Sequence, residues 1–217
     1  MEQSDAEILW EVASVLARDA AKVSREAGRP GPVLPPLLFF TDPDRTPRPW
    51  ETAARLPAGS GVVFRHFGAA DALETARRLR EATAAHGGLL LIGLDADLAE
   101  TVGADGVHLP ERALEQATRL KALRPDWRIS GAAHAREALA RAGQLDGVVI
   151  SPVFPAGGAS SATPALGLAG FQALAARSPC PVHALGGIDA SNGRSLIGSG
   201  ACGLAGVSAI QAAFGPA

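Results

Sequence analysis

Residues 181–210 read PVHALGGIDASNGRSLIGSGACGLAGVSAI, and this stretch decides the fold. It holds two short apolar runs, Val182–Leu185 and Gly203–Ala205, each bounded by Pro or Gly. Runs of this kind are typical of strands that flanking helices bury on both faces. Between them, residues 189–198 are expected to form a helix, with Asp189 and Ser191 as candidate N-caps and a Gly-Ser-Gly stop. The stretch therefore predicts two successive strand–helix units.

Both apolar runs end in small residues, the first in Gly186-Gly187 and the second in Gly206-Val207-Ser208. Glycine lets the backbone approach a ligand that a Cβ atom would block, and a helix N-terminus that follows such a turn favours an anion. Barrels of eight βα units bind phosphate at their last two units. We therefore expect a phosphate site at Gly186, Gly187, Val207 and Ser208. Glycines that only make tight turns are the alternative, which the sequence leaves open.

The composition indicates one globular α/β domain. The chain has 217 residues, 47% of them hydrophobic and 19% charged, so a large core is available. The net charge is −2 with no basic run, which argues against nucleic acid as a partner. Cys180 and Cys202 lack zinc-type spacing and are expected to be small buried residues in a reducing compartment. No secretory leader or membrane span is expected, and the predicted location is the cytoplasm.

From residue 37 onward, strand and helix patterns alternate. Residues 1–36 are predicted to form an N-terminal helix, at 5–27, and a Pro-rich linker, while residues 37–217 form the barrel domain. The predicted strands cover residues 37–41, 61–67, 89–93, 106–109, 128–133, 147–151, 182–185 and 203–205. The predicted crossover helices begin near residue 49 and cover 71–85, 95–102, 111–123, 135–142 and 167–176, before the two closing units.

Eight such units predict a closed (β/α)8 TIM barrel with an extra N-terminal helix that plugs or flanks it. An open doubly wound sheet is the alternative fold, although no GxGxxG motif opens the first unit. A role in binding a partner is the alternative for the first helix. A homo-oligomer is left open.

Function is expected where the strands end, because the loops after barrel strands build the active face. Arg65 is the candidate anion ligand, and His134 is a candidate general acid or base. A hydrogen-bonded structural histidine is the alternative for His134. Further candidate substrate-binding residues are Thr41, His108, Ser151 and Pro152. The loop 154–164, FPAGGASSATP, is a candidate lid. Three strand-end histidines also suggest zinc, but few carboxylates accompany them, so no metal ligand is assigned.

Several motifs together resemble one family, thiamine phosphate synthase and its relative the thiazole tautomerase (TenI-like). The resemblance covers roughly residues 37–212. The motifs that carry it are GADGVHL at 103–109, ISPVFP at 150–155, GL at 167–168, ALGGI at 184–188 with Asn192, and residues 203–210. The resemblance implies a (β/α)8 barrel whose last two glycine-rich turns hold the phosphate of a thiazole phosphate.

In the synthases that the chain resembles, the thiazole nitrogen attacks the methylene carbon of hydroxymethylpyrimidine diphosphate. Diphosphate is the leaving group, and two aspartates of the family bind Mg²⁺. This chain keeps Arg65 of the diphosphate cluster but departs elsewhere. The family's glutamine and lysine around that arginine are Val63 and Phe67 here. Its magnesium aspartates fall on Leu94 and Ala113, which cannot bind the ion, and its lid Thr-Lys falls on residues 158–159. Each lost group removes charge stabilisation on the scale of ~3 kcal/mol.

The resembled tautomerase shifts a proton on a thiazole carboxylate phosphate, needs no magnesium and uses a histidine after the fifth strand. His134 is the matching residue here. The leading interpretation is a thiamine-phosphate-synthase-like enzyme that takes a small phosphate substrate. A tautomerase and a non-catalytic thiazole phosphate binder are the two alternatives.

Overall fold

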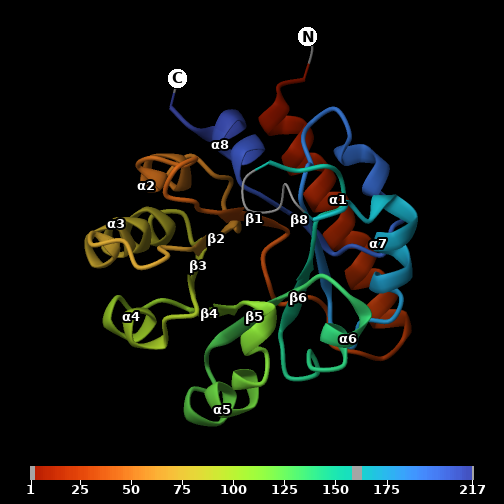
Figure 1. Cartoon of the computed structure of the whole chain (residues 1–217). Helices are drawn as coiled ribbons and strands as arrows, with labels where there is room; N and C mark the ends of the chain where they lie inside the picture. Colours follow the sequence, from red (N-terminus) through yellow and green to blue (C-terminus); the bar gives the residue numbers. More distant parts are fainter. Residues whose placement is uncertain (1–2, 158–162, 217) are drawn as a thin grey trace.

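The protein is a closed barrel of parallel strands in the order β1 to β8. The computed structural model describes residues 3–157 and 163–216. Each strand pairs with the next one along the chain, and β8 returns to β1. Figure 1 looks into the barrel, with the helices arranged around the strands. The predicted (β/α)8 fold is therefore confirmed, and the open sheet is not adopted.

The strands are short and buried, as the apolar runs predicted. Their bounds are β1 Leu37–Phe40, β2 Gly61–Phe64, β3 Leu89–Gly93, β4 Gly106–Leu109, β5 Arg128–Ala133, β6 Gly147–Ile150, β7 Val182–Leu185 and β8 Gly203–Gly206. The helices are α1 Asp5–Glu26, α2 Pro49–Ala53, α3 Ala72–Ala84, α4 Ala96–Thr101, α5 Gln116–Leu123, α6 Arg136–Leu139, α7 Gly167–Ala175 and α8 Ser208–Phe214. The described residues also form the short 3₁₀ helices η1 Glu111–Ala113 and η3 Gly193–Leu196.

The core has two parts because each strand is covered on both faces. Inside the barrel, Leu38 and Phe40 of β1 pack with Val63, Leu91 and Val149 from other strands. A larger cluster fills the space between the strands and the surrounding helices. Burial on both faces explains why these strands lack the alternating pattern of a half-exposed sheet. The described residues include no helix long and apolar enough to cross a membrane.

Helix α1 belongs to the helical layer around the barrel. It begins at a capping box in which Ser4 and Glu7 bond each other's backbone N–H groups. Its buried face, with Leu9, Val12 and Leu16, joins the main core, and the helix packs against β8, η3, α8 and β1 (Figure 1). The crossover from β7 to β8 contains only the four-residue η3 in place of an α-helix. The predicted helix is confirmed and flanks the barrel, while the division at residue 36 stays a prediction.

Three predicted elements are shorter than expected. Strand β2 ends at Phe64, so Arg65 lies in the loop. The helix expected at 111–123 is split into η1 and α5, and the one expected at 135–142 is reduced to α6. Pro110, which precedes Glu111, has an extended backbone. Its carbonyl accepts the N–H of Ala113, three residues on, which is the hydrogen bond of a 3₁₀ helix. Local hydrogen bonding at the strand ends thus overrides the helical pattern.

Candidate functional site

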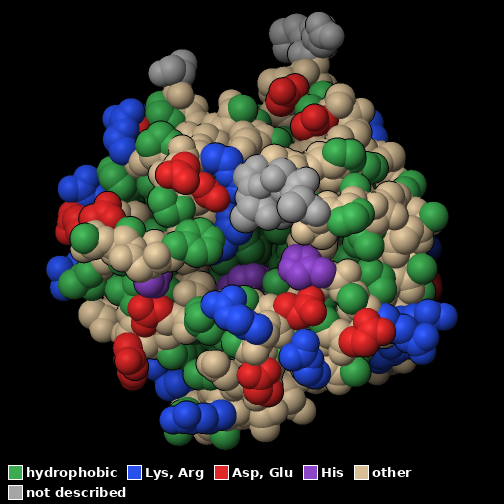
Figure 2. All heavy atoms as spheres, viewed as in Figure 1, with side chains coloured by type: hydrophobic (Ala, Val, Ile, Leu, Met, Phe, Trp, Pro, Cys, Tyr) green, Lys and Arg blue, Asp and Glu red, His purple; other side chains and the backbone are tan. Residues whose placement is uncertain are grey.

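The carboxyl ends of the strands open onto a hollow at the mouth of the barrel. In Figure 2 this face has histidine and hydrophobic side chains within the hollow, with Lys or Arg side chains close to its edge. In (β/α)8 enzymes the loops at this end carry the active site. The candidate site therefore consists of the strand-end residues around this hollow.

A cavity of about 500 Å³ joins the two glycine-rich turns at this mouth. Gly186, Gly187, Val207 and Ser208, the four predicted phosphate-binding residues, all line it. Arg65, from the other side of the barrel, lines it too. Its other walls include the segments 155–157 and 188–190, the start of α1, Arg45 and part of α8. The cavity thus combines small-residue backbone with a cation, which suits an anionic ligand.

The turn after β7 requires glycine at two positions. Gly186 has φ +101° and Gly187 has φ +64°, which are left-handed conformations. A Cβ on Gly186 would lie 2.7 Å from Pro152 Cα, and one on Gly187 would lie 2.5 Å from the Pro155 carbonyl oxygen. The turn is therefore pressed against the segment after β6, and any side chain would push the two apart.

The helix expected after this turn, at 189–198, is not formed, and only η3 appears there. The carboxylate of Asp189 accepts the backbone N–H groups of Ser191 and Asn192 at 2.9 and 3.2 Å. A side chain that bonds nearby backbone in this way competes with helix formation. These N–H groups are occupied by Asp189, so the expected helix N-terminus does not supply them to an anion.

Arg65 is anchored by Thr41, and its buried Nη2 makes no hydrogen bond to the described residues. The Oγ1 of Thr41 accepts its backbone N–H at 2.9 Å, and the carbonyl of Thr41 accepts its Nε–H at 2.8 Å. Its guanidinium carbon lies over the ring of Phe40 at 5.4 Å from the centroid and over that of Phe67 at 5.5 Å. Among the described residues, nothing hydrogen-bonds its buried Nη2. Burial lowers the pKa of Arg65 to about 10, so it stays charged at neutral pH.

Two further parts of the site could not be placed from the sequence. Arg45, in the loop after β1, lines the cavity and bonds Asp42 Oδ2 at 2.8 Å. That hydrogen bond lowers the pKa of the Asp42 carboxyl, which also lies 3.9 Å from Arg65 Nη2. Asp5 and Leu9 of α1 line the cavity as well. Arg45 could have been proposed from the sequence, because it is a charged residue in a loop that follows a barrel strand. Asp5 reaches this site only through the tertiary fold.

His134 lies after β5 with its tautomer fixed by a carbonyl. Its Nδ1 is 2.7 Å from the carbonyl oxygen of Ser151 and 3.3 Å from Ser151 Oγ. Because a carbonyl only accepts, Nδ1 carries the proton, and Nε2 of the neutral ring presents a lone pair. Its backbone N–H is accepted by Glu111 at 2.8 Å. The ring is therefore arranged as a base in an exposed position at the mouth.

The other predicted site residues lie in two groups. Ser151 and Pro152 lie between His134 and the turn after β7. The Ser151 carbonyl bonds the His134 ring, and Pro152 packs on Gly186. His134 itself is not among the described residues that line the cavity. His108 lies inside the barrel, where its Nδ1 is 2.8 Å from Ser130 Oγ and its ring meets Phe40 edge-on. Burial lowers the pKa of His108 to about 3, with a smaller effect from Arg65, so it is neutral.

The residues at the family's magnesium positions do not fit the ion. Leu94 and Ala113 carry no side-chain oxygen, which Mg²⁺ requires. The neighbouring carboxylates have other partners: Asp95 lies 3.3 Å from His66 and caps α4, and Glu111 binds the His134 backbone. The described ranges contain no cluster of three or more His, Cys, Asp or Glu that could hold a metal. The expected lid falls partly on residues 158–162, which lie outside the described residues.

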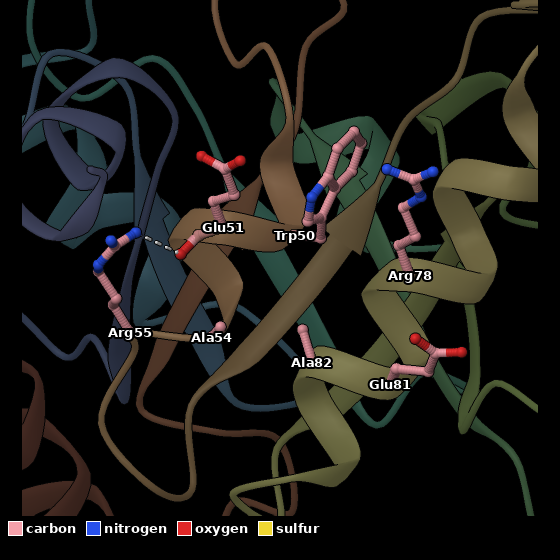
Figure 3. A pocket seen from close by; sticks show the side chains of 7 residues that line it. All are labelled: Trp50, Glu51, Ala54, Arg55, Arg78, Glu81 and Ala82. Atoms are coloured by element: carbon pink, nitrogen blue, oxygen red, sulfur yellow. Dashed lines mark hydrogen bonds between the residues drawn. The ribbon is translucent and has the colours of Figure 1, made fainter. Parts of the chain in front are cut away.

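A separate hollow of about 830 Å³ lies on the outer wall between α2 and α3. Figure 3 shows Arg78 of α3 beside Trp50 of α2, and the two stack at 4.7 Å. The other arginine, Arg55, donates to the carbonyl of Glu51 at 3.1 Å. Both cations are engaged within the protein, so the barrel mouth is the candidate site.

The fold is that of a (β/α)8 barrel with a cavity between two glycine-rich turns at its mouth. The model of the family described as thiamine monophosphate synthase matches residues 43–210. The chain is 33% identical to the thiamine-phosphate synthase of Methanoculleus marisnigri over 164 residues, covering 72% of this chain and 78% of that protein. It is 32% identical to the one of Laribacter hongkongensis over 170 residues, covering 76% and 81%. The chain belongs to the thiamine monophosphate synthase family.

A solved structure gives the same fold independently. The thiamine phosphate pyrophosphorylase from Pyrococcus furiosus superposes with a TM-score of 0.69 at 24% identity, covering 82% of this chain and 91% of that one. Family membership confirms the resemblance drawn from the motifs. The roles of individual site residues stay predictions.

Proposed function

We propose that this protein acts in thiamine biosynthesis on a thiazole phosphate, whose phosphate group binds in the glycine-lined cavity. One observation carries the proposal: two glycine-rich turns and Arg65, with its unpartnered Nη2, line one cavity of about 500 Å³. A buried guanidinium nitrogen without a hydrogen-bond acceptor favours an anionic ligand, and a phosphate oxygen is a suitable acceptor. The names of the relatives support thiamine biosynthesis as the setting.

The reaction that the site supports best is a proton shift on the bound thiazole, as in a tautomerase. The Nε2 atom of His134 would take a proton from one position of the ring and return it at another, with no net change in charge. The carbonyl of Ser151 holds the proton on Nδ1 and so keeps Nε2 free for this exchange. No magnesium ligand is needed for such a step.

The second candidate reaction is the coupling of the thiazole phosphate with hydroxymethylpyrimidine diphosphate. The relatives named thiamine-phosphate synthase favour it. In this chain Arg65 and Arg45 would be the cations next to the departing diphosphate. They are the positive charges that line the cavity, whereas the magnesium positions hold Leu94 and Ala113.

Calorimetric titration followed by turnover assays tests the proposal. Thiazole phosphate is titrated first, and the pyrimidine diphosphate is titrated separately with Mg²⁺. Binding of thiazole phosphate alone, with isomerisation of its carboxylate precursor that persists in EDTA, supports the proton shift. Formation of thiamine phosphate from both substrates supports coupling, and binding without either reaction indicates a non-catalytic binder. Failure to bind thiazole phosphate contradicts the proposal.

A further inference from the structure

His134 is held from two sides by the loops of neighbouring strands. On one side, the carbonyl oxygen of Ser151, after β6, accepts the N–H of its ring Nδ1 at 2.7 Å. On the other side, the carboxylate Oε2 of Glu111, after β4, accepts its backbone N–H at 2.8 Å. The first hydrogen bond sets the tautomer of the ring. The second one determines where the backbone that carries the ring lies.

The segment that carries His134 is only weakly ordered by its own secondary structure. His134 is exposed, and the helix that follows it, α6, has four residues. The N-cap residue of α6 is Ala135, whose methyl group cannot bond the first turn. A helix this short forms too few hydrogen bonds to offset the cost of its nucleation. The position of His134 therefore depends on contacts with the neighbouring loops.

Glu111, by contrast, lies on an element that is packed against the barrel. It begins η1, and Leu114, directly after η1, is buried in the main core. Leu114 packs on β5, because a Cβ atom on Gly131 would overlap its Cδ2. Gly131 lies on β5 three residues before His134. The element that carries Glu111 is thus fixed on the strand that leads to His134.

The other carboxylate oxygen of Glu111 faces the far end of the same segment. Its Oε1 lies 4.0 Å from Nη2 of Arg141, which follows α6. Glu111 therefore contacts the chain both before and after this helix. Arg141 also lies 3.8 Å from Oε2 of Glu115 through its Nη1. The two glutamates share the arginine, whereas the hydrogen bond to the His134 backbone comes from Glu111.

We propose that Glu111 is a positioning residue, which places His134 for the proton shift through the hydrogen bond to its backbone N–H. The inference rests on the proposed function, because it gives Glu111 a part in the same reaction. Glu111 acts through the histidine, and it is not among the described residues that line the cavity between the glycine-rich turns. Without this bond the ring should shift relative to the bound thiazole, and a misplacement of about 1 Å can lower a rate by roughly 10²-fold.

Steady-state kinetics of three variants test the inference. Glu111→Ala removes the acceptor, and Glu111→Gln keeps an oxygen of the same reach. Glu115→Ala is the matched control, because it removes the other carboxylate beside Arg141. We expect Glu111→Ala to lower kcat of the proton shift by roughly 10–100-fold, with KM and the affinity for inorganic phosphate unchanged. Glu111→Gln should recover most of kcat, and Glu115→Ala should behave like wild type.

Nitrogen NMR of the imidazole rings provides a readout that does not depend on turnover. The chain has five histidines, and the signals of His134 are those missing from His134→Gln. In wild type at neutral pH we expect the neutral ring to carry its proton on Nδ1. In Glu111→Ala we expect a mixture of the two neutral tautomers, because the displaced ring no longer keeps its bond to Ser151. Glu115→Ala should keep the wild-type tautomer.

An unchanged kcat in Glu111→Ala overturns the inference. An equal loss of kcat in Glu115→Ala also overturns it, because the effect would then come from Arg141. Failure of Glu111→Gln to recover kcat would show that the charge matters and not the hydrogen bond, which contradicts the inference as well. If wild type shows no proton shift, the proposed function fails, and the tautomers decide the positioning role: an unchanged tautomer in Glu111→Ala overturns it.

Discussion

At the scale of single residues, the hydrogen bond from His134 Nδ1 to the Ser151 carbonyl determines what the histidine can do. Replacing His134 with Gln keeps a donor of similar reach but removes the basic nitrogen. We predict that turnover in the proton-shift reaction falls by roughly 10²–10⁴-fold, the usual contribution of a general acid–base group, with little change in affinity. Steady-state kinetics measure kcat and KM.

The control for this variant is His86→Gln. His86 follows α3, where its Nε2 lies 3.0 Å from the Ala53 carbonyl. It lies next to the amino-terminal end of β3, away from the mouth, so its replacement should not change turnover. Unchanged turnover in His134→Gln would show that this histidine is a structural one, the alternative that the sequence left open.

Gly187 and Gly198 form a matched pair for the phosphate turn. Both have positive φ, +64° and +81°, so an alanine at either position is strained by about 1 kcal/mol. A Cβ on Gly187 would meet Pro155 and Phe154, whereas one on Gly198 would meet nothing within 4 Å. We predict that Gly187→Ala loses inorganic phosphate binding by at least about tenfold and Gly198→Ala keeps it. Calorimetric titration of inorganic phosphate into both variants tests this prediction. Equal phosphate affinities of the two variants would mean that phosphate binds away from this turn.

At the scale of elements, α1 has two kinds of contact with the barrel. Leu16 is 1% exposed in the main core, whereas Arg194 of η3 bonds Glu11 at 2.8 Å through half-exposed side chains. We predict that Leu16→Ala lowers the free energy of unfolding by about 2–5 kcal/mol. Arg194→Ala should lower it much less than Leu16→Ala, because solvent screens the exposed pair.

Urea unfolding of both variants measures these changes. The comparison tests whether burial or surface charge holds the helix on β8. A larger loss in Arg194→Ala than in Leu16→Ala would contradict the burial argument. The packing of α1 on β8 also accounts for Asp5, the first residue of α1, lining the cavity at the mouth.

At the scale of the whole molecule, two buried histidines make stability depend on pH. Burial lowers the pKa of His108 to about 3 and that of His183 to about 4. The unfolded chain, with pKa near 6.5, therefore binds more protons than the folded protein as the pH falls through 6.5 toward 4. The free energy of unfolding is therefore highest above about pH 6.5. Each histidine should lower it by about 2 kcal/mol between pH 7 and pH 5.

Denaturant unfolding at several pH values between 7 and 5 checks this expectation. The His183 ring is fully buried, with Nε2 at 2.8 Å from the Pro35 carbonyl, so its protonation has no solvent compensation. His108→Gln should remove about half of the slope. A free energy of unfolding that is flat across this range would contradict the prediction.

Much of the fold could be predicted from the sequence because its signals are local. The apolar runs at 182–185 and 203–205, with the glycines that follow them, indicate buried strands from local sequence alone. The bounds of helices were harder to predict. At residues 189–198 the helical pattern was wrong, because the Asp189 carboxylate bonds the backbone and leaves room only for η3.

The sequence by itself determined the barrel, the glycine-rich turns and the absence of oxygen ligands at Leu94 and Ala113, because periodicity, backbone freedom and side-chain chemistry are properties of single residues and their neighbours. Only the tertiary structure decided that Arg45 and Asp5 line the cavity between the glycine-rich turns, that the Ser151 carbonyl sets the tautomer of His134, and that Arg65 lies against Phe67. These relations join residues from separate strands and loops. Closure of the barrel brings them together, and no local pattern records it.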